Sequence, residues 1–493
     1  MFLVIAYSML MLSFIAKAEV DLVIKNVTVI SAISKHQVQT KPNSWVAISD
    51  NRIIALGDKA QAPKAKRVID ATGQFLMPGL MDSHTHLKTL PGFNFQAKSA
   101  KKMHQHYHQR QGGNYLYYGV TQLVDPSNTQ RGIDKFRANG LAPDAFFCGA
   151  MPIFNGYNAI GIQFNQLHEK RPYYVAQETD PDTSNTIKAL HQAKNAVQRL
   201  ASEGANCAKV FIEDGFNFAN HIPLISDASL KELTEHATSL NLPVMAHANA
   251  TDMQKIAVDS GISIMAHGLW NWLEEQNLSH SNALPPKVVN VLDKIIERDI
   301  AYQPTLNVMR SLTDLVVENH LKRPEYLTIL PQWQIDWYLS EPGQWFANEF
   351  VKDWGGASKK EIITKMTAKQ INGQRVVKYL YDNGGTILLA SDTPPSPTYA
   401  SQPGLSTFWE LQDMAKAGLD LEGILAAATL NNAKAYNLDN DYGTVDTGKI
   451  ANLLLLNSNP LESIRAYNAI DKVILQGKVI NRAKLHVREL NNF

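Results

Sequence analysis

Eight short apolar runs alternate with longer helical patterns over most of the chain, and this rhythm strongly constrains the fold. The runs are residues 80–86, 120–126, 145–151, 207–213, 242–248, 263–268, 301–306 and 386–392. Segments between them, such as 183–203, 227–240, 251–259 and 285–298, have the apolar spacing of helices. Strands that alternate with helices pair in parallel. Eight such strands predict an α/β fold with a closed, TIM-like (β/α)8 barrel.

The two ends of the chain have a different pattern. Residues 21–30, 44–48, 52–57, 451–456 and 470–480 are short runs of strand-forming residues separated by turn residues. They predict a small β-sandwich domain made of residues 19–76 and 437–493, attached to a barrel of residues 77–436.

One connection within the expected barrel is unusually long. A helical insertion is predicted at about residues 307–384, and it contains Trp333, Trp337, Trp345 and Trp354. A connection of this length favours an active-site lid or an added helical module. A packing or oligomer surface is the alternative, because aromatic residues also dominate interfaces.

The composition is that of a globular protein, with 45% hydrophobic and 19% charged residues among 493. Lys and Arg number 47 against 46 Asp and Glu, which gives a net charge of +1. This balance disfavours nucleic acid and anionic membranes as partners. A small-molecule substrate is the expected partner, and a homo-oligomer stays open.

The first eighteen residues are distinct from the rest of the chain. Residues 2–16 are almost entirely apolar, and Ala16-Lys17-Ala18 has the small-x-small pattern of a cleavage site. A signal peptide of residues 1–18 is predicted, so the mature chain would be exported without stable membrane insertion: periplasmic in a Gram-negative bacterium, otherwise secreted. An uncleaved membrane anchor is the alternative, although the run is short for a bilayer span.

The two cysteines, Cys148 and Cys207, are too few to form a disulfide framework. Two buried thiols are expected.

Polar residues occur at corresponding ends of the expected strands. They are His84, His86, Lys209, His247, His267 and Asp392. Residues i and i+2 of a strand face the same side, so His84 and His86 project together. Each residue also has an ordinary interpretation, as a hydrogen-bonded histidine, a solvated lysine or a helix-capping aspartate. Because the carboxyl ends of barrel strands converge on one mouth, the six together predict a metal site.

The sequence resembles the amidohydrolase superfamily, in the branch of imidazolonepropionase-like and Xaa-Pro dipeptidase-like (prolidase-like) enzymes. The resemblance covers nearly the whole mature chain and includes residues 21–26, 52–57, 69–73, 119–121, 266–268, 304–306 and 448–453. It implies two Zn2+ ions. One would be held by His84, His86 and Asp392, and the other by His247 and His267.

The resemblance also implies that Lys209 is N6-carboxylated and bridges the two ions. A lysine cation cannot bind a metal, whereas a carbamate offers two anionic oxygens. Its formation needs a neutral amine, which burial and nearby cations favour. Imidazoles together with carboxylate-type oxygens suit Zn2+.

The activity implied is hydrolysis of amide or other C–N bonds in small molecules, dipeptides or cyclic amides, by a hydroxide that bridges the metals. Asp392 would accept the proton of that hydroxide and pass it to the leaving nitrogen. An Xaa-Pro-type dipeptide is the first substrate to consider. Hydrolysis of esters, lactones or organophosphates is an alternative, since the same nucleophile attacks them. A non-catalytic binding protein on the same barrel is a second alternative, which would lack some of the ligands.

Three further residues are candidates for contact with substrate. Tyr157 and Arg171 lie in the segment after the third expected strand, and Tyr302 lies near the end of the seventh. Loops at a barrel mouth commonly carry recognition residues, and arginine suits carboxylates.

Overall fold

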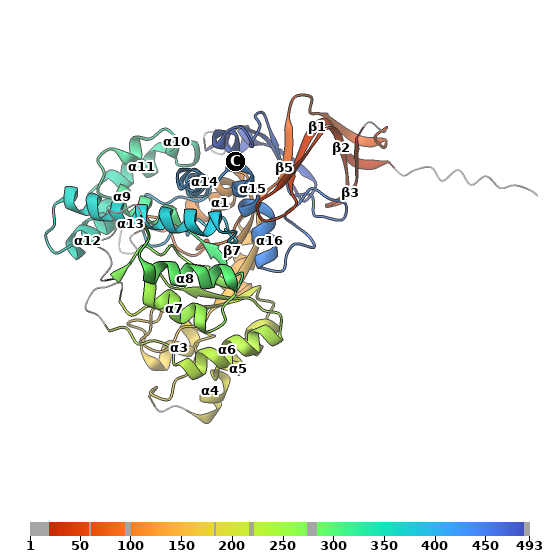
Figure 1. Ribbon diagram of the computed structural model, residues 1–493. Coiled ribbons are helices and arrows are strands. Elements are labelled where there is room, and N and C mark those ends of the chain that lie inside the picture. The colour runs from red at the N-terminus through yellow and green to blue at the C-terminus, as the bar shows by residue number, and fades with distance from the viewer. Residues whose placement is uncertain are drawn as a thin grey trace, which may run out of the picture.

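The computed structural model describes residues 19–58, 61–93, 100–181, 184–215, 221–273 and 283–487. The expected signal peptide, residues 1–18, lies outside these described residues. Figure 1 shows β1, β2 and β3 at one side of the helical body, with the helices α9 to α12 at the opposite side. Among the described residues, no helix has both the length and the apolarity that crossing a membrane requires.

A seven-stranded parallel sheet follows the order of the chain. Its strands are β6 (Leu80–Asp82), β7 (Val120–Asp125), β8 (Asp144–Ala150), β9 (Cys207–Phe211), β10 (Val244–His247), β11 (Ile264–Ala266) and β12 (Ala301–Gln303). In the register, Lys209 is opposite Met245, and His247 is opposite Ala266. His267 directly follows Ala266, the last residue of β11. Lys209, His247 and His267 therefore lie toward the carboxyl-terminal side of three neighbouring strands.

The eighth expected strand differs from the prediction. Residues 386–392 form no strand of the sheet. Ile387 makes an isolated parallel bridge with Tyr302 on one side, and Thr393, the next residue after this segment, makes one with Thr85 on the other. Two features limit the pairing. The amide of Leu389 donates to the carbonyl oxygen of Ala427 at 3.1 Å, and Asp392 has a φ of 51°, outside the extended region.

Both ends of the chain contribute to a second, mixed sheet of eight strands. The strands are β1 (Val20–Ala32), β2 (Val38–Ser49), β3 (Arg52–Asp58), β4 (Ala65–Asp70), β5 (Phe75–Pro78), β13 (Leu453–Leu456), β14 (Ile470–Leu475) and β15 (Lys478–Asn481). Their order is β15-β14-β13-β5-β1-β2-β3, with β4 paired to β1. The union of both ends is as expected, but the strands form one connected sheet where a sandwich of two sheets was predicted. This is because β5 joins the C-terminal strands to β1.

Helices lie between the strands of the parallel sheet in the sequence and after the last of them. They are α1 (Ala100–Tyr117), α2 (Gln130–Ala138), α3 (Phe164–Lys170), α4 (Asn185–Leu190), α5 (Ala193–Ser202), α6 (Asp227–Ser239), α7 (Thr251–Asp259), α8 (Pro286–Glu297), α14 (Leu405–Lys416), α15 (Leu421–Ala426) and α16 (Asn432–Ala435). In α8, Val288, Val291, Leu292 and Ile295 are buried, which is one face of a helix. Helix α6 begins at Ser226, whose side chain accepts from the amide of Ser229.

The long connection after β12 is helical. It contains α9 (Leu306–Asp314), α10 (Tyr326–Ile329), α11 (Gln332–Leu339), α12 (Trp345–Asp353) and α13 (Lys359–Asp382). Polar contacts tie α9 to α14. The buried carboxylate of Glu410 accepts from the amides of Leu306, at 3.0 Å, and Asn307, at 2.6 Å, and Arg310 pairs with buried Asp413. These contacts fix the first turn of the connection next to the sheet.

Cys148 and Cys207 are joined in a disulfide between β8 and β9, with their Cα atoms 4.4 Å apart. The expectation of two thiols is therefore wrong. Pairing of β8 with β9 places the two cysteines directly opposite each other across 59 positions of sequence, and the sequence alone does not reveal that register.

The core of the mixed sheet supplies a test of its stability. Leu455 on β13 is fully buried in this core, whereas Val68 on β4 is 52% exposed. We expect Leu455→Ala to lower the free energy of unfolding by about 2–5 kcal/mol, through lost burial and the cavity left behind. Val68→Ala is the matched control, with an expected loss of about 0.5 kcal/mol or less. Urea denaturation measures both, and equal losses would contradict this account of the core.

Candidate metal centre

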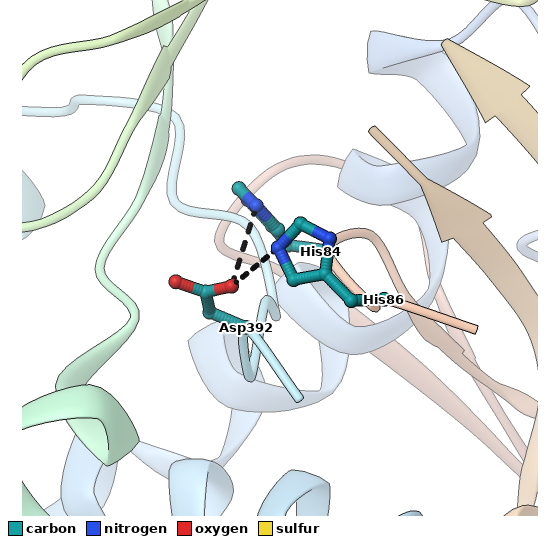
Figure 2. Close-up of side chains that lie close together, drawn as sticks. All are labelled: His84, His86 and Asp392. Atoms are coloured by element: carbon teal, nitrogen blue, oxygen red, sulfur yellow. Dashed lines mark ion pairs between the residues drawn. The ribbon is translucent and has the colours of Figure 1, made fainter. Parts of the chain in front are cut away.

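Two histidines and one carboxylate meet directly at the edge of the parallel sheet. His84 and His86 follow β6, and Asp392 comes from the segment beside it. The Nε2 atom of His86 lies 2.9 Å from Asp392 Oδ1, and that of His84 lies 3.5 Å from the same oxygen. Figure 2 shows both imidazole rings directed at the carboxylate. One ligand atom from each residue lies within 4.8 Å of the others, a spacing compatible with one metal ion.

Two further histidines adjoin this group. His267 Nδ1 lies 3.4 Å from Asp392 Oδ2, so this carboxylate contacts three imidazoles. The ring centroid of His267 lies 4.9 Å from that of His84 and 4.5 Å from that of His247. The structure therefore brings together all four histidines and the aspartate that were predicted to bind metal.

The electrostatics of these groups suit metal binding. Burial lowers the pKa of His84, His247 and His267, so their rings are neutral and have a lone pair to offer. Burial acts in the same direction on His86, but the hydrogen bond and charge of Asp392 outweigh it and raise its pKa. Burial alone would raise the pKa of Asp392, whereas the surrounding histidines hold it well below its usual range, so it is a carboxylate.

Gln303 on β12 fixes the orientation of His84. Its amide nitrogen donates to the carbonyl oxygen of Ser83 at 2.9 Å and to the hydroxyl of Tyr436 at 2.8 Å. Its oxygen therefore accepts from Nδ1 of His84, at 2.8 Å. That bond places the ring hydrogen on Nδ1 and leaves Nε2 free to bind a metal, as outer partners of metal-binding histidines commonly do.

Lys209 lies in the same pocket. Its side chain is 2% exposed, and Nζ lies 3.3 Å from the sulfur of Met245. No described carboxylate forms an ion pair with it within 4.0 Å. Burial lowers the pKa of Lys209 to about 7, with partial opposition from the charge of Asp392. A substantial neutral fraction at neutral pH is the state in which an amine reacts with carbon dioxide.

The backbone adopts unfavourable conformations at several residues of this centre. Three non-glycine residues have positive φ angles there, His267 at 79°, Thr305 at 43° and Asp392 at 51°. Such conformations cost about 1–3 kcal/mol each, persist only where the surroundings enforce them, and cluster at functional sites. Asn307 contributes to this enforcement, since its side-chain amide donates to the carbonyl oxygen of Ser391 at 3.3 Å.

A cavity of about 780 Å³ opens over the centre and is lined by all six of the predicted metal ligands. Of the three predicted substrate contacts, Tyr157 and Arg171 line it, and Tyr157 stacks on His247 with ring centroids 4.5 Å apart. Tyr302 does not line it. The hydroxyl of Tyr302 is buried and accepts from the amide of Leu269 at 2.8 Å, which is a structural role.

Two residues of the site, Glu213 and Gln303, are not among the predicted ligands and substrate contacts. Glu213 is 1% exposed and its Oε2 lies 3.5 Å from Nε2 of His247. It ends the fourth expected strand, so the strand-end criterion that selected His247 applied equally to Glu213. Gln303 also lies beside a strand end, but its contact with His84 is evident only from the structure.

Comparisons with known proteins agree with this geometry. Residues 351–480 match the model of the amidohydrolase family. An imidazolonepropionase of Kosmotoga olearia is 21% identical over 452 residues, which cover 90% of this chain and 92% of that protein. The chain belongs to the amidohydrolase superfamily. An imidazolonepropionase of Streptomyces griseus subsp. griseus is 30% identical over 96 residues, and this amidohydrolase spans only 24% of its length in that alignment.

The fold of this amidohydrolase also matches solved structures. The crystal structure of a Xaa-Pro dipeptidase with bound methionine superposes with a TM-score of 0.65 at 17% identity. The match covers 93% of this chain and 99% of the dipeptidase. This likeness shows that the two proteins share a fold.

Proposed function

We propose that this amidohydrolase is a metal-dependent hydrolase of amide or other C–N bonds in small molecules, such as dipeptides or cyclic amides. One observation carries the proposal. Four histidines, one aspartate and one buried lysine, spread over three hundred positions of sequence, line a single cavity. Neutral imidazoles and carboxylate oxygens are ligands that suit Zn2+.

The donor set fits two Zn2+ ions. His84, His86 and Asp392 would hold one ion, His247 and His267 the other, and a carboxylated Lys209 would lie between them. When bound, such ions lower the pKa of water and polarise a carbonyl group. Asp392 would hold the proton given up by that water at one carboxylate oxygen and deliver it to the leaving nitrogen. Gln303 keeps the ring of His84 in the tautomer that this arrangement requires.

We also propose that the parallel sheet closes into a (β/α)8 barrel through residues 386–393. In support, the amide of Leu388 donates to the carbonyl oxygen of Tyr302 at 2.9 Å on one side. On the other side, the amide of Ser83 donates to the carbonyl oxygen of Leu389 at 3.0 Å. The barrel would then comprise residues 77–436, with the mixed sheet of both chain ends as its second domain.

Metal content and substrate range test the proposed function together. We expect the purified protein to hold about two Zn2+ per chain, and to hydrolyse members of a panel of dipeptides, N-acyl amino acids and cyclic amides. Removal of metal by a chelator should abolish this activity, and added Zn2+ should restore it. His247→Asn should lower the metal content, whereas His236→Asn, on the surface of α6, is the matched control.

Three results would count against the proposal. Absence of stoichiometric metal would indicate a different chemistry or a non-catalytic binding protein. Activity that survives complete metal removal would exclude the metal-dependent mechanism. A higher kcat/KM for esters, lactones or organophosphates than for any amide would favour that alternative class of substrate.

A further inference from the structure

One wall of the cavity is apolar and comes mainly from the helical connection. Its side chains lie on α9, α12 and α13, and with Trp270 they belong to one hydrophobic cluster: Val308, Met309, Leu312, Phe350, Trp354 and Met366. Phe350 and Trp354 are only half-buried, so their rings retain accessible surface where they line the cavity. A ligand group that covered this surface would gain about 25 cal/mol per Å² of apolar area removed from water.

Two cations line the cavity on different segments, Lys88 after β6 and Arg171 after α3. Arg171 is held in place, since its Nε donates to the carbonyl oxygen of Asn158 at 2.7 Å and its Nη1 to that of Lys170 at 3.0 Å. Within the described parts of the chain, neither cation has a carboxylate within ion-pair distance.

The charge of the cavity wall is positive overall. Besides the six predicted metal ligands, the described charged side chains that line it are Lys88, Lys170, Arg171 and Lys369 against Asp125 and Asp353. The carboxylate of Asp125 already accepts hydrogen bonds from the amides of Leu87 and Ser127 and from the side chain of Asn128. An excess of cations in a partly desolvated site attracts an anionic ligand and repels an ammonium group.

We propose that the substrate is an N-acylated amino acid with a bulky apolar acyl group and no free amine. Its carboxylate contacts Lys88 and Arg171, and its acyl group covers Phe350 and Trp354. The predicted metal ligands line the same cavity, and in this pose the amide bond between the two groups would lie over them. This inference rests on the proposed hydrolase function and adds to it the chemical class of the substrate. The helical connection would thereby select substrates that have a bulky apolar acyl group.

Matched compounds and variants test the proposal on the metal-loaded protein. The compounds are an N-aroyl amino acid, its C-terminal carboxamide, the N-acetyl analogue, and a dipeptide with an aromatic N-terminal residue. We expect kcat/KM for the N-aroyl acid to exceed that of each of the other three by at least about tenfold. Lys88→Met should lower the acid-to-carboxamide ratio by about tenfold, because it removes a charge-assisted contact. Lys231→Met, a surface change on α6, should keep that ratio.

A second pair of variants examines the apolar wall. Phe350→Ala should reduce the preference for aroyl over acetyl substrates by about tenfold, and Phe350→Leu should restore part of it, since buried apolar groups discriminate by this order. Circular dichroism confirms that each variant is folded.

Binding is measured independently of turnover with an N-arylsulfonyl amino acid, which resists hydrolysis, and with its carboxamide. Calorimetry should give at least about tenfold tighter binding of the acid to the parent protein and a smaller difference for Lys88→Met. Equal binding of acid and carboxamide, or equal turnover of acetyl and aroyl substrates, would overturn the substrate class while leaving amide hydrolysis intact. Preferential binding of the acid without hydrolysis of any amide would support the binding assignment and instead contradict the proposed function.

Discussion

Replacement of Asp392 by asparagine is expected to lower kcat by about a thousandfold or more, because the group proposed to hold the proton is lost. Asp392 is the point at which the site converges, since its two oxygens contact His86 at 2.9 Å, His267 at 3.4 Å and His84 at 3.5 Å. An asparagine of the same shape keeps one acceptor oxygen but has no charge and cannot accept a proton at neutral pH. Steady-state kinetics on the best substrate of the panel measures the effect.

The variant should keep its fold, which separates loss of chemistry from loss of structure. Circular dichroism and the urea midpoint are expected to match those of the parent protein. Asp134→Asn on the surface of α2 is the matched control, because within the described residues its carboxylate accepts only one hydrogen bond, an exposed one from Gln130. A kcat for Asp392→Asn within tenfold of the parent value would contradict the proton-transfer role assigned to this residue.

Sequence spacing was sufficient to predict that the four histidines at the ends of strands lie close together. His84 and His86 alternate along a strand, and His247 and His267 follow neighbouring strands, so their meeting follows from parallel pairing. The extent of pairing could not be predicted in the same way. Residues 386–392 have the composition of a strand, but Leu389 bonds to Ala427, and Asp392 has a positive φ. Both effects arise from tertiary contacts.

Side-chain direction explains most of the remaining differences. Tyr302 lies near the end of a strand as predicted, yet its hydroxyl accepts from the amide of Leu269, away from the cavity. Gln303, one residue later, lies against His84 instead. Adjacent residues of a strand face opposite sides. A prediction that is wrong by one position therefore selects a residue such as Tyr302, which packs away from the cavity, in place of Gln303, which contacts His84. The register between β8 and β9 likewise places Cys148 opposite Cys207, and this register could not be predicted from the sequence.

Replacement of Lys209 by alanine tests the proposed link between the two metal ions. The side chain is buried, has a pKa lowered by burial to about 7, and has no described carboxylate as an ion-pair partner. As an ammonium group it would repel two cations, so its presence among four histidines is favourable only if it is neutral or carboxylated. We expect Lys209→Ala to lose bound Zn2+ and to lower kcat/KM by roughly a hundredfold or more, since even outer partners of metal ligands are worth 10–100-fold in affinity.

Chemical rescue distinguishes a bridging carbamate from a lysine that only fills space. The alanine variant leaves a space next to the predicted metal ligands, and acetate or propionate can enter it and offer the two oxygens that the proposed carbamate would supply. Added short carboxylic acids should therefore restore part of the metal content and activity of Lys209→Ala. They should have no effect on Lys255→Ala, in which the removed lysine lies on the surface and pairs with Asp259 at 2.8 Å. Retention of both ions by Lys209→Ala, with no response to carboxylic acids, would show that Lys209 does not bridge them.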